Sequence, residues 1–160
     1  KGLKNFKGVG RRFEAGQIAM CDQSKILIDD YGHHPTEILV TLKAIKEKFP
    51  AKRIVMIFEP HRYSRTKQLF KDFIKVLLKV DQLILLDIYP ASERPIRGIS
   101  SSRLMDQINQ HKGNAIHLSN DFAIEWVKEN YKEFDILVTQ GAGTISQLNH
   151  SIKEKWALKK

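Results

Sequence analysis

Side chains suited to proton transfer and anion binding are concentrated in a few short segments that each follow an apolar run. The first segment, residues 29–36, holds two adjacent aspartates and two adjacent histidines directly before Pro35. Asp29 or Asp30 can accept a hydrogen bond from a ribose hydroxyl or lie near a metal ion, and His33 can orient a substrate or move a proton near neutral pH. The same side chains can instead cap a turn and fill the start of a helix. Both interpretations stay open for this segment alone.

A second segment, residues 59–66, places His61, Arg62 and Arg65 before a helix that we expect to begin near Thr66. Two guanidinium groups beside a helix N-terminus form an anion site, because forked donors and free N–H groups both favour a carboxylate or a phosphate. The alternative is a surface loop whose arginines are merely solvated. The segment by itself does not decide between the two.

Two further segments are weaker signals. Residues 88–95 contain two prolines and are typical of a rigid spacer in which Glu93 and Arg94, like Arg97 just after it, are only solvated. The Gly-Ala-Gly of residues 141–143 follows an apolar run, so its backbone can approach a ligand closely, although a plain tight turn explains it as well. The sequence contains no G-x-x-x-x-G-K-[ST] motif and therefore no P-loop.

Short apolar runs alternate with stretches of helical period, which is typical of βα units on a largely parallel sheet. We expect strands at residues 18–21, 25–29, 53–58, 82–87, 115–118 and 136–139. The fold predicted is an open, mostly parallel, doubly wound (Rossmann-like) α/β sheet with helices on both faces. The polar segments then share the carboxyl edge of the sheet, where such folds bind ligands. Cys21 is expected to be a small core residue.

Composition limits the class of protein. A chain of 160 residues with one cysteine fits a single domain without a disulfide, in a reducing, cytoplasmic setting. The formal charge of +9 comes mostly from residues 1–12 (+5) and 153–160 (+3), which leaves +1 for residues 13–152. We therefore expect solubilising charge at the chain ends and no nucleic-acid binding. The longest apolar runs are too short to span a bilayer, so no membrane span is expected. No metal site is expected either. Residues 1–16 are expected to be an interdomain linker or the end of a preceding domain, and residues 17–160 one domain.

The motifs, taken in order, resemble the C-terminal domain of the Mur ligase family, in particular the branch that adds L-alanine. The matching stretches are residues 10–14 (GRRFE), 29–38 (DDYGHHPTEI), 58–66 (FEPHRYSRT), 89–93 (YPASE) and 141–143 (GAG). The likeness covers nearly the whole chain. Its most specific part is the string from His61 to Thr66.

The resemblance implies an ATP-dependent ligase that joins L-alanine to UDP-N-acetylmuramate through an acyl phosphate, in peptidoglycan synthesis in the cytoplasm. It also implies N-terminal and central domains on the same polypeptide, the central one holding the P-loop and most contacts to ATP and Mg2+. The missing P-loop is then explained. The chain alone is expected to be inactive, and closure is expected to need a hinge near residues 10–16.

Residue roles also follow from the resemblance. Arg12 and Asp30 would contact the ribose or the phosphates of ATP. The amino-acid site would be lined by Tyr31, His33, His61, Arg62, Ser64 and Arg65. The arginines would hold the carboxylate of L-alanine, and a neutral His33 would act as the catalytic residue that holds the amine or accepts its proton. The roles of Ser92, Glu93, Arg94 and Thr144 stay open.

Two other functions remain as alternatives. One is a murein peptide ligase domain that takes a tripeptide, against which the string from Arg62 to Arg65 argues. The other is a stand-alone nucleotide-binding module, which would explain an α/β domain without catalytic machinery.

Overall fold

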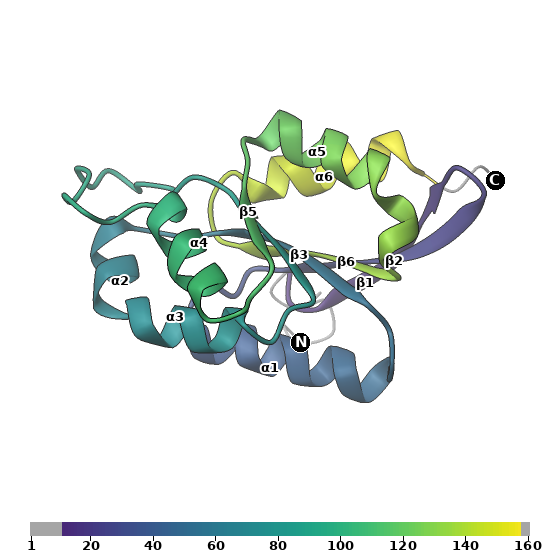
Figure 1. Cartoon of the computed structure of the whole chain (residues 1–160). Helices are drawn as coiled ribbons and strands as arrows, with labels where there is room; N and C mark the ends of the chain where they lie inside the picture. The colour runs from purple at the N-terminus through teal and green to yellow at the C-terminus, as the bar shows by residue number, and fades with distance from the viewer. Residues whose placement is uncertain (1–10, 158–160) are drawn as a thin grey trace, which may run out of the picture.

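The computed structural model describes residues 11–157, so Gly10 of the first motif and the terminal Lys159 and Lys160 lie outside the described residues. A six-stranded sheet forms the middle layer (Figure 1). Its strands are β1 (Glu14–Met20), β2 (Gln23–Asp30), β3 (Ile54–Glu59), β4 (Gln82–Leu85), β5 (Ala115–His117) and β6 (Ile136–Gly141), in the order β1-β2-β6-β3-β4-β5. Only β1 runs antiparallel to its neighbour among these described strands. The predicted open, mostly parallel sheet is confirmed.

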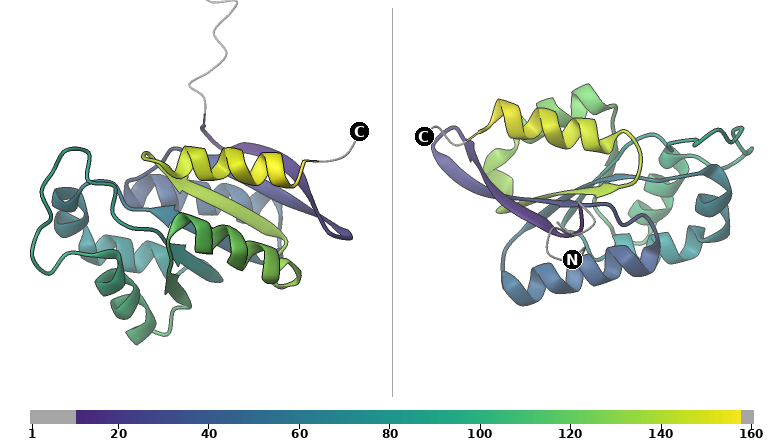
Figure 2. Two further views of the ribbon diagram at one scale, coloured as in Figure 1. Left: turned by 90° about the horizontal axis from the view of Figure 1, so that it is seen from above. Right: turned by 180° about the vertical axis from the view of Figure 1, so that it is seen from behind.

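Helices cover both faces of the sheet, as Figures 1 and 2 show. The helices are α1 (Pro35–Lys48), α2 (Tyr63–Gln68), α3 (Phe70–Leu77), α4 (Ser101–Gln110), α5 (Asn120–Glu129) and α6 (Ile145–Lys155), with a 3-10 turn η1 (Tyr131–Glu133). Helices α1, α3 and α4 pack on one face around the buried Phe58 and Phe73. Helices α5 and α6 pack on the other, around Ile57 and Leu137. Adjacent Ile57 and Phe58 enter different cores because side chains alternate along a strand.

Several element boundaries differ from the sequence prediction, and two of them bear on the functional edge. Strand β1 begins at Glu14, earlier than the apolar pattern indicated, because residues 14–17 pair with β2 through the backbone while their side chains stay exposed. Helix α2 begins at Tyr63 rather than near Thr66, so Arg65 lies inside the helix and not before it.

Cys21 is exposed, and the prediction that it is a core residue was wrong. It lies in the two-residue connection between the paired Met20 and Gln23, where its φ is 54°. Such tight hairpin connections require positive φ and point their side chains to solvent. Within residues 11–157, none of the helices has the length and apolar character that crossing a membrane requires.

Candidate functional site

The predicted convergence of the polar segments is present in the fold. Strands β2, β6, β3 and β4 are mutually parallel neighbours, so the loops that follow them meet at one edge of the sheet. The adjacent Asp29 and Asp30 end β2, and both are buried. Because side chains alternate along the strand, the two carboxylates take different partners on opposite faces.

Asp30 fixes the loop that carries the first histidine. Its Oδ1 accepts hydrogen bonds from Gly32 N (2.8 Å) and Gln140 Nε2 (2.7 Å), and its Oδ2 accepts from Phe13 N (2.9 Å). A Cβ on Gly32 would lie 2.7 Å from both Asp30 Oδ1 and Gln140 Nε2, so only glycine fits this close approach. The backbone leading to His33 is therefore held in place.

Asp29 binds Arg11, a residue that the sequence analysis did not single out. Arg11 donates from Nε to Asp29 Oδ2 (2.9 Å) and from Nη2 to Oδ1 (3.2 Å), and Nη2 also donates to Gly141 O (3.1 Å). Thr139 Oγ1 donates to Asp29 Oδ1 (3.0 Å). Arg11 thus ties the segment before β1 to the ends of β2 and β6.

Arg12, by contrast, has an exposed side chain at a cavity of about 530 Å³ on the α1 side of this edge. Asp30 and Tyr31 line the same cavity, so the two residues predicted to contact ATP lie together. The remaining lining residues are Phe13, Gly32, Thr36, Glu37, Val40, Thr41 and Ala44. Tyr31 is 44% exposed at the cavity, and the guanidinium of Arg11 lies 5.6 Å from the centroid of its ring.

His34 and Glu37 form the start of α1. Nδ1 of His34 accepts from Thr36 N (3.2 Å), and Oε2 of Glu37 accepts from the backbone N–H groups of both His33 and His34 (2.8 Å each). Partial burial opposes ionisation of Glu37, but these two hydrogen bonds bring its pKa below the usual range. His34 is therefore a helix cap, as the second interpretation of this segment held, whereas His33 points elsewhere.

Four rings lie in a row across the edge. The centroid of His33 is 5.4 Å from that of Tyr31 and 5.3 Å from that of His61, and the ring of His61 stacks on Tyr89 at 5.4 Å. Tyr89 also pairs with His61 through an isolated parallel bridge. The structure therefore brings Tyr31, His33 and His61 together and adds Tyr89, which the sequence offered as part of a spacer and of the 89–93 motif but not as a site residue.

Hydrogen bonds determine which nitrogen of each ring carries a proton. Arg65 Nη1 donates to His61 Nδ1 (3.1 Å), and since a guanidinium has no acceptor, the proton of a neutral His61 is on Nε2. Nδ1 of His33 lies 3.2 Å from Tyr31 O, and a carbonyl only accepts, so His33 Nδ1 is protonated. Nε2 of a neutral His33 is then a free base. Burial, together with the charges of His33, Arg65 and Arg62, lowers the pKa of His61.

The remaining predicted residues occupy the start of α2. Arg62 is the N-cap, with an exposed side chain and a φ of 73°. Arg65 reaches back to His61 through Nδ1 and also through the carbonyl oxygen (3.2 Å). Ser64 faces Glu93, to which it donates from N (2.9 Å) and Oγ (2.5 Å). Glu93 is thus a hydrogen-bonding partner of α2 and not merely a solvated side chain of a spacer.

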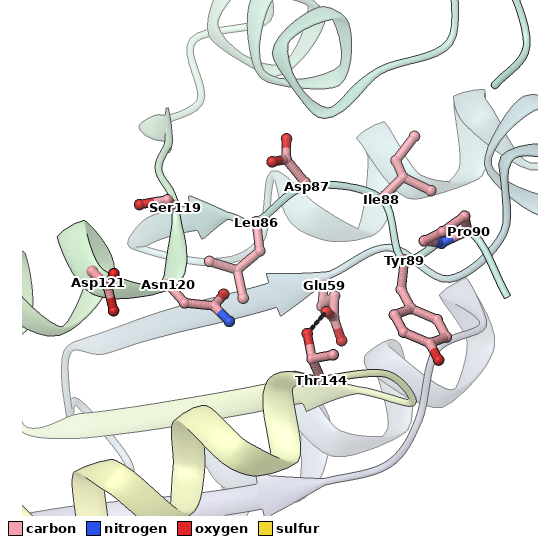
Figure 3. Close-up of a pocket in the computed structure, with 10 residues that line it drawn as sticks. All are labelled: Glu59, Leu86, Asp87, Ile88, Tyr89, Pro90, Ser119, Asn120, Asp121 and Thr144. Carbon is pink, nitrogen blue, oxygen red and sulfur yellow. Dashed lines mark hydrogen bonds between the residues drawn. The ribbon is translucent and has the colours of Figure 1, made fainter.

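A second cavity of about 390 Å³ lies at the ends of β3, β4, β5 and β6 (Figure 3). The buried Glu59 accepts from Thr144 Oγ1 (2.6 Å) and from Ile145 N (3.0 Å), and Figure 3 shows the first bond beside the ring of Tyr89. A Cβ on Gly143 would lie 2.5 Å from Glu59 Oε2 and 2.6 Å from the Tyr89 ring. Sequence reasoning missed Glu59, although a carboxylate that ends an apolar strand directly before a proline was a usable signal.

No three carboxylate, imidazole or thiol groups within residues 11–157 gather in an arrangement that can hold a metal ion. The polar edge offers two kinds of chemistry. One is anion binding by the exposed Arg62 beside Arg65, and the other is proton transfer at His33.

Residues 11–143 match the family described as "Mur ligase, glutamate ligase domain". Among solved structures, the chain is similar to UDP-N-acetylmuramate-alanine ligase MurC from Thermotoga maritima (24% identity, TM-score 0.66, 96% of this chain and 31% of that one). It is also similar to a murein peptide ligase from Psychrobacter arcticus (22%, TM-score 0.70, 95% and 31%) and to folylpolyglutamate synthase from Thermotoga maritima (21%, TM-score 0.61, 98% and 34%). These identities show a shared fold. The chain spans about a third of the length of these proteins.

Proposed function

The chain belongs to the family of Mur ligase, glutamate ligase domains, and we propose that it closes over ATP and binds the amino acid in a ligase that joins L-alanine to UDP-N-acetylmuramate. The observation that carries this proposal is that the free base of His33 lies on the same edge of the sheet as the guanidinium groups of Arg62 and Arg65. Nε2 of His33 has no hydrogen-bond partner among residues 11–157, and its ring lies 5.3 Å from that of His61, which Arg65 holds.

The carboxylate and the ammonium group of the amino acid must be treated differently during the reaction. Its carboxylate must be held, and Arg62 and Arg65 do this without losing a proton, since arginine stays charged at all working pH values. Its ammonium must lose a proton before it can attack, and the free Nε2 of His33 accepts that proton. The amine nitrogen then forms a bond to the carbonyl carbon of the muramoyl phosphate. The nitrogen of the tetrahedral intermediate then passes its extra proton to the departing phosphate, and the C–O bond breaks to give the amide and inorganic phosphate.

We assign the ATP contacts to the cavity at Arg12 and Asp30. Asp30 already accepts three hydrogen bonds, so about one of its four acceptor positions remains for a ribose hydroxyl. The guanidinium of Arg12 can meet a phosphate, and the exposed ring of Tyr31 can cover the nucleotide. Residues 11–157 hold no cluster of three acidic, imidazole or thiol side chains that could bind Mg2+ by themselves, and the steps above use none of its chemistry. The proposal places the P-loop and the Mg2+ ligands in the central domain.

The proposed partners are the N-terminal and central domains of one cytoplasmic polypeptide that serves peptidoglycan synthesis. Residues 1–160 alone would then be inactive. Closure of this domain must exclude water from the acyl phosphate, because water otherwise competes with the amine.

The test is ADP release by the longer polypeptide that contains this chain, supplied with UDP-N-acetylmuramate, ATP and Mg2+. The acceptors compared are L-alanine, glycine, L-serine and a murein tripeptide, with residues 1–160 alone as the control. Turnover with L-alanine by the longer polypeptide only is the expected result. Turnover with the tripeptide would move the assignment to a murein peptide ligase. No turnover with any acceptor would favour a nucleotide-binding module.

A further inference from the structure

The turn that presents the two arginines has an unfavourable backbone. Arg62 has a φ of 73°, and Ala91 and Ser92 in the facing loop have φ values of 47° and 70°. Residues other than glycine rarely have positive φ values, and such conformations persist only where the surrounding structure enforces them. The segment at Arg62 therefore needs contacts that hold it.

Part of this support comes from the backbone of residues 89–93. Arg62 N donates to Tyr89 O (2.8 Å), and Tyr89 N donates to Pro60 O (2.8 Å). These bonds fix the chain on the N-terminal side of Arg62. They leave the first turn of α2, where Ser64 and Arg65 lie, without support from that loop backbone.

The carboxylate of Glu93 supplies the missing support. It accepts from both donors of Ser64, N at 2.9 Å and Oγ at 2.5 Å, so one side chain binds the residue midway between the two arginines. These hydrogen bonds and the positive charge of Arg62 lower the pKa of Glu93. The carboxylate therefore stays ionised, and both of its oxygens remain acceptors.

We propose that Glu93 is a positioning residue, which acts through Ser64 to hold Arg62 and Arg65 in the geometry that binds the carboxylate of the amino-acid substrate. This inference rests on the proposed function of the same edge. It predicts that the loop of residues 89–93 contributes to amino-acid affinity without contacting the amino acid. It also predicts that loss of either partner of the Glu93–Ser64 contact has the same effect.

Three variants of the longer polypeptide test the inference: Glu93→Gln, Ser64→Ala and the double variant. In Glu93→Gln the size is kept but the charge is lost, and one acceptor oxygen becomes an NH2 group that can only donate to Ser64 Oγ, so neither contact to Ser64 stays charge-assisted. The expected result is a rise in KM for L-alanine of about tenfold, with kcat within about twofold. The double variant should be no worse than the poorer single variant, because both changes break one contact. Glu125→Gln, an exposed carboxylate on α5, is the matched control and should leave KM unchanged.

A second readout separates this inference from the function on which it rests. In residues 1–160, amide hydrogen exchange at Ser64 should be about tenfold faster in Glu93→Gln than in the unsubstituted chain or in Glu125→Gln. An unsubstituted ligase that turns over L-alanine while Glu93→Gln leaves its KM unchanged would overturn the inference alone. A ligase that uses no amino acid would overturn the proposed function and this inference with it. A Glu93→Gln variant that loses kcat and is also less stable in urea would show that Glu93 has a structural role only.

Discussion

Arg65 donates a hydrogen bond from Nη1 to Nδ1 of His61 at 3.1 Å, and Nη1 also binds the carbonyl oxygen of His61. A guanidinium can only donate, so this contact requires that Nδ1 of His61 carries no proton. The same arginine is proposed to hold the amino acid. The protonation state of His61 and the position of Arg65 are therefore coupled.

We predict that His61 titrates below its ordinary pKa of 6.5, because burial and the charges of His33, Arg65 and Arg62 disfavour the imidazolium. Since the folded pKa is depressed, the contribution of His61 to stability is present above pH 6.5 and is lost as the pH falls toward the folded pKa. In Arg65→Ala the pKa of His61 should rise toward 6.5, although burial of the ring still keeps it below that value. NMR titration of the histidine ring protons measures both values.

The matched control for this titration is Arg53→Ala, which removes a guanidinium at the opposite end of β3 and should leave the pKa of His61 unchanged. A His61 that titrates at or above 6.5 in the unsubstituted chain would contradict the assignment of its neutral form.

Replacement of Asp30 by Asn should destabilise the chain. The new NH2 group would face the N–H donors of Phe13, Gly32 or Gln140, so at least one of these buried or partly buried donors loses its acceptor. The expected loss in free energy of unfolding is about 1–3 kcal/mol. Urea unfolding measures it, with the exposed Asp106→Asn on α4 as the control, for which we expect a change within about 0.5 kcal/mol. Equal stability of the two variants would mean that Asp30 does not hold the loop.

Gly143 and Gly16 form a matched pair of glycines. A Cβ at Gly143 would collide with Glu59 and Tyr89, whereas nothing lies within 4 Å of a Cβ at Gly16. Gly143→Ala should therefore lower the free energy of unfolding by about 1–3 kcal/mol, and Gly16→Ala should change it by less than about 0.5 kcal/mol. Thermal unfolding of both variants is the measurement. A neutral Gly143→Ala would show that Glu59 and the turn move apart easily.

Asp135 should contribute to resistance to acid. The backbone N–H of Arg53 (2.9 Å) lowers its pKa, partial burial opposes this, and Lys52 (3.1 Å) lowers it further. A depressed folded pKa means that the stabilisation is present above the ordinary value of 3.8 and is lost as the pH falls through the folded pKa. The stability difference between the unsubstituted chain and Asp135→Asn should thus shrink in strong acid. A difference that stays constant between neutral pH and strong acid would contradict this assignment.

The sequence was sufficient for the features that repeat along a strand or depend on chain order. Buried strands such as β3 and β6 are continuous apolar runs, and once they are parallel, the segments that follow them must share an edge. That reasoning located His33, His61 and Arg65 at one site. The family resemblance, which rested on the same segments, is confirmed by the match over residues 11–143.

Features that depend on one tertiary contact were not predictable. Arg11 and Arg12 are adjacent and chemically identical, and only the position of Asp29 decides that Arg11 is bound while Arg12 stays exposed. The role of Glu93 depends on Ser64, which is 29 residues away. The exposure of Cys21 follows from a turn geometry that its residue type does not signal.

The most direct test of the account separates the two halves of the proposed reaction in the longer polypeptide. Acyl phosphate formation is followed by hydroxylamine trapping without amino acid, and amide formation is followed at increasing L-alanine. For Arg62→Ala and Arg65→Ala we predict unchanged trapping and a loss in amino-acid use of about 10- to 100-fold, or about 1–3 kcal/mol each. Equal loss in both halves, or unchanged kinetics in both variants, would contradict the claim that this edge binds the amino acid.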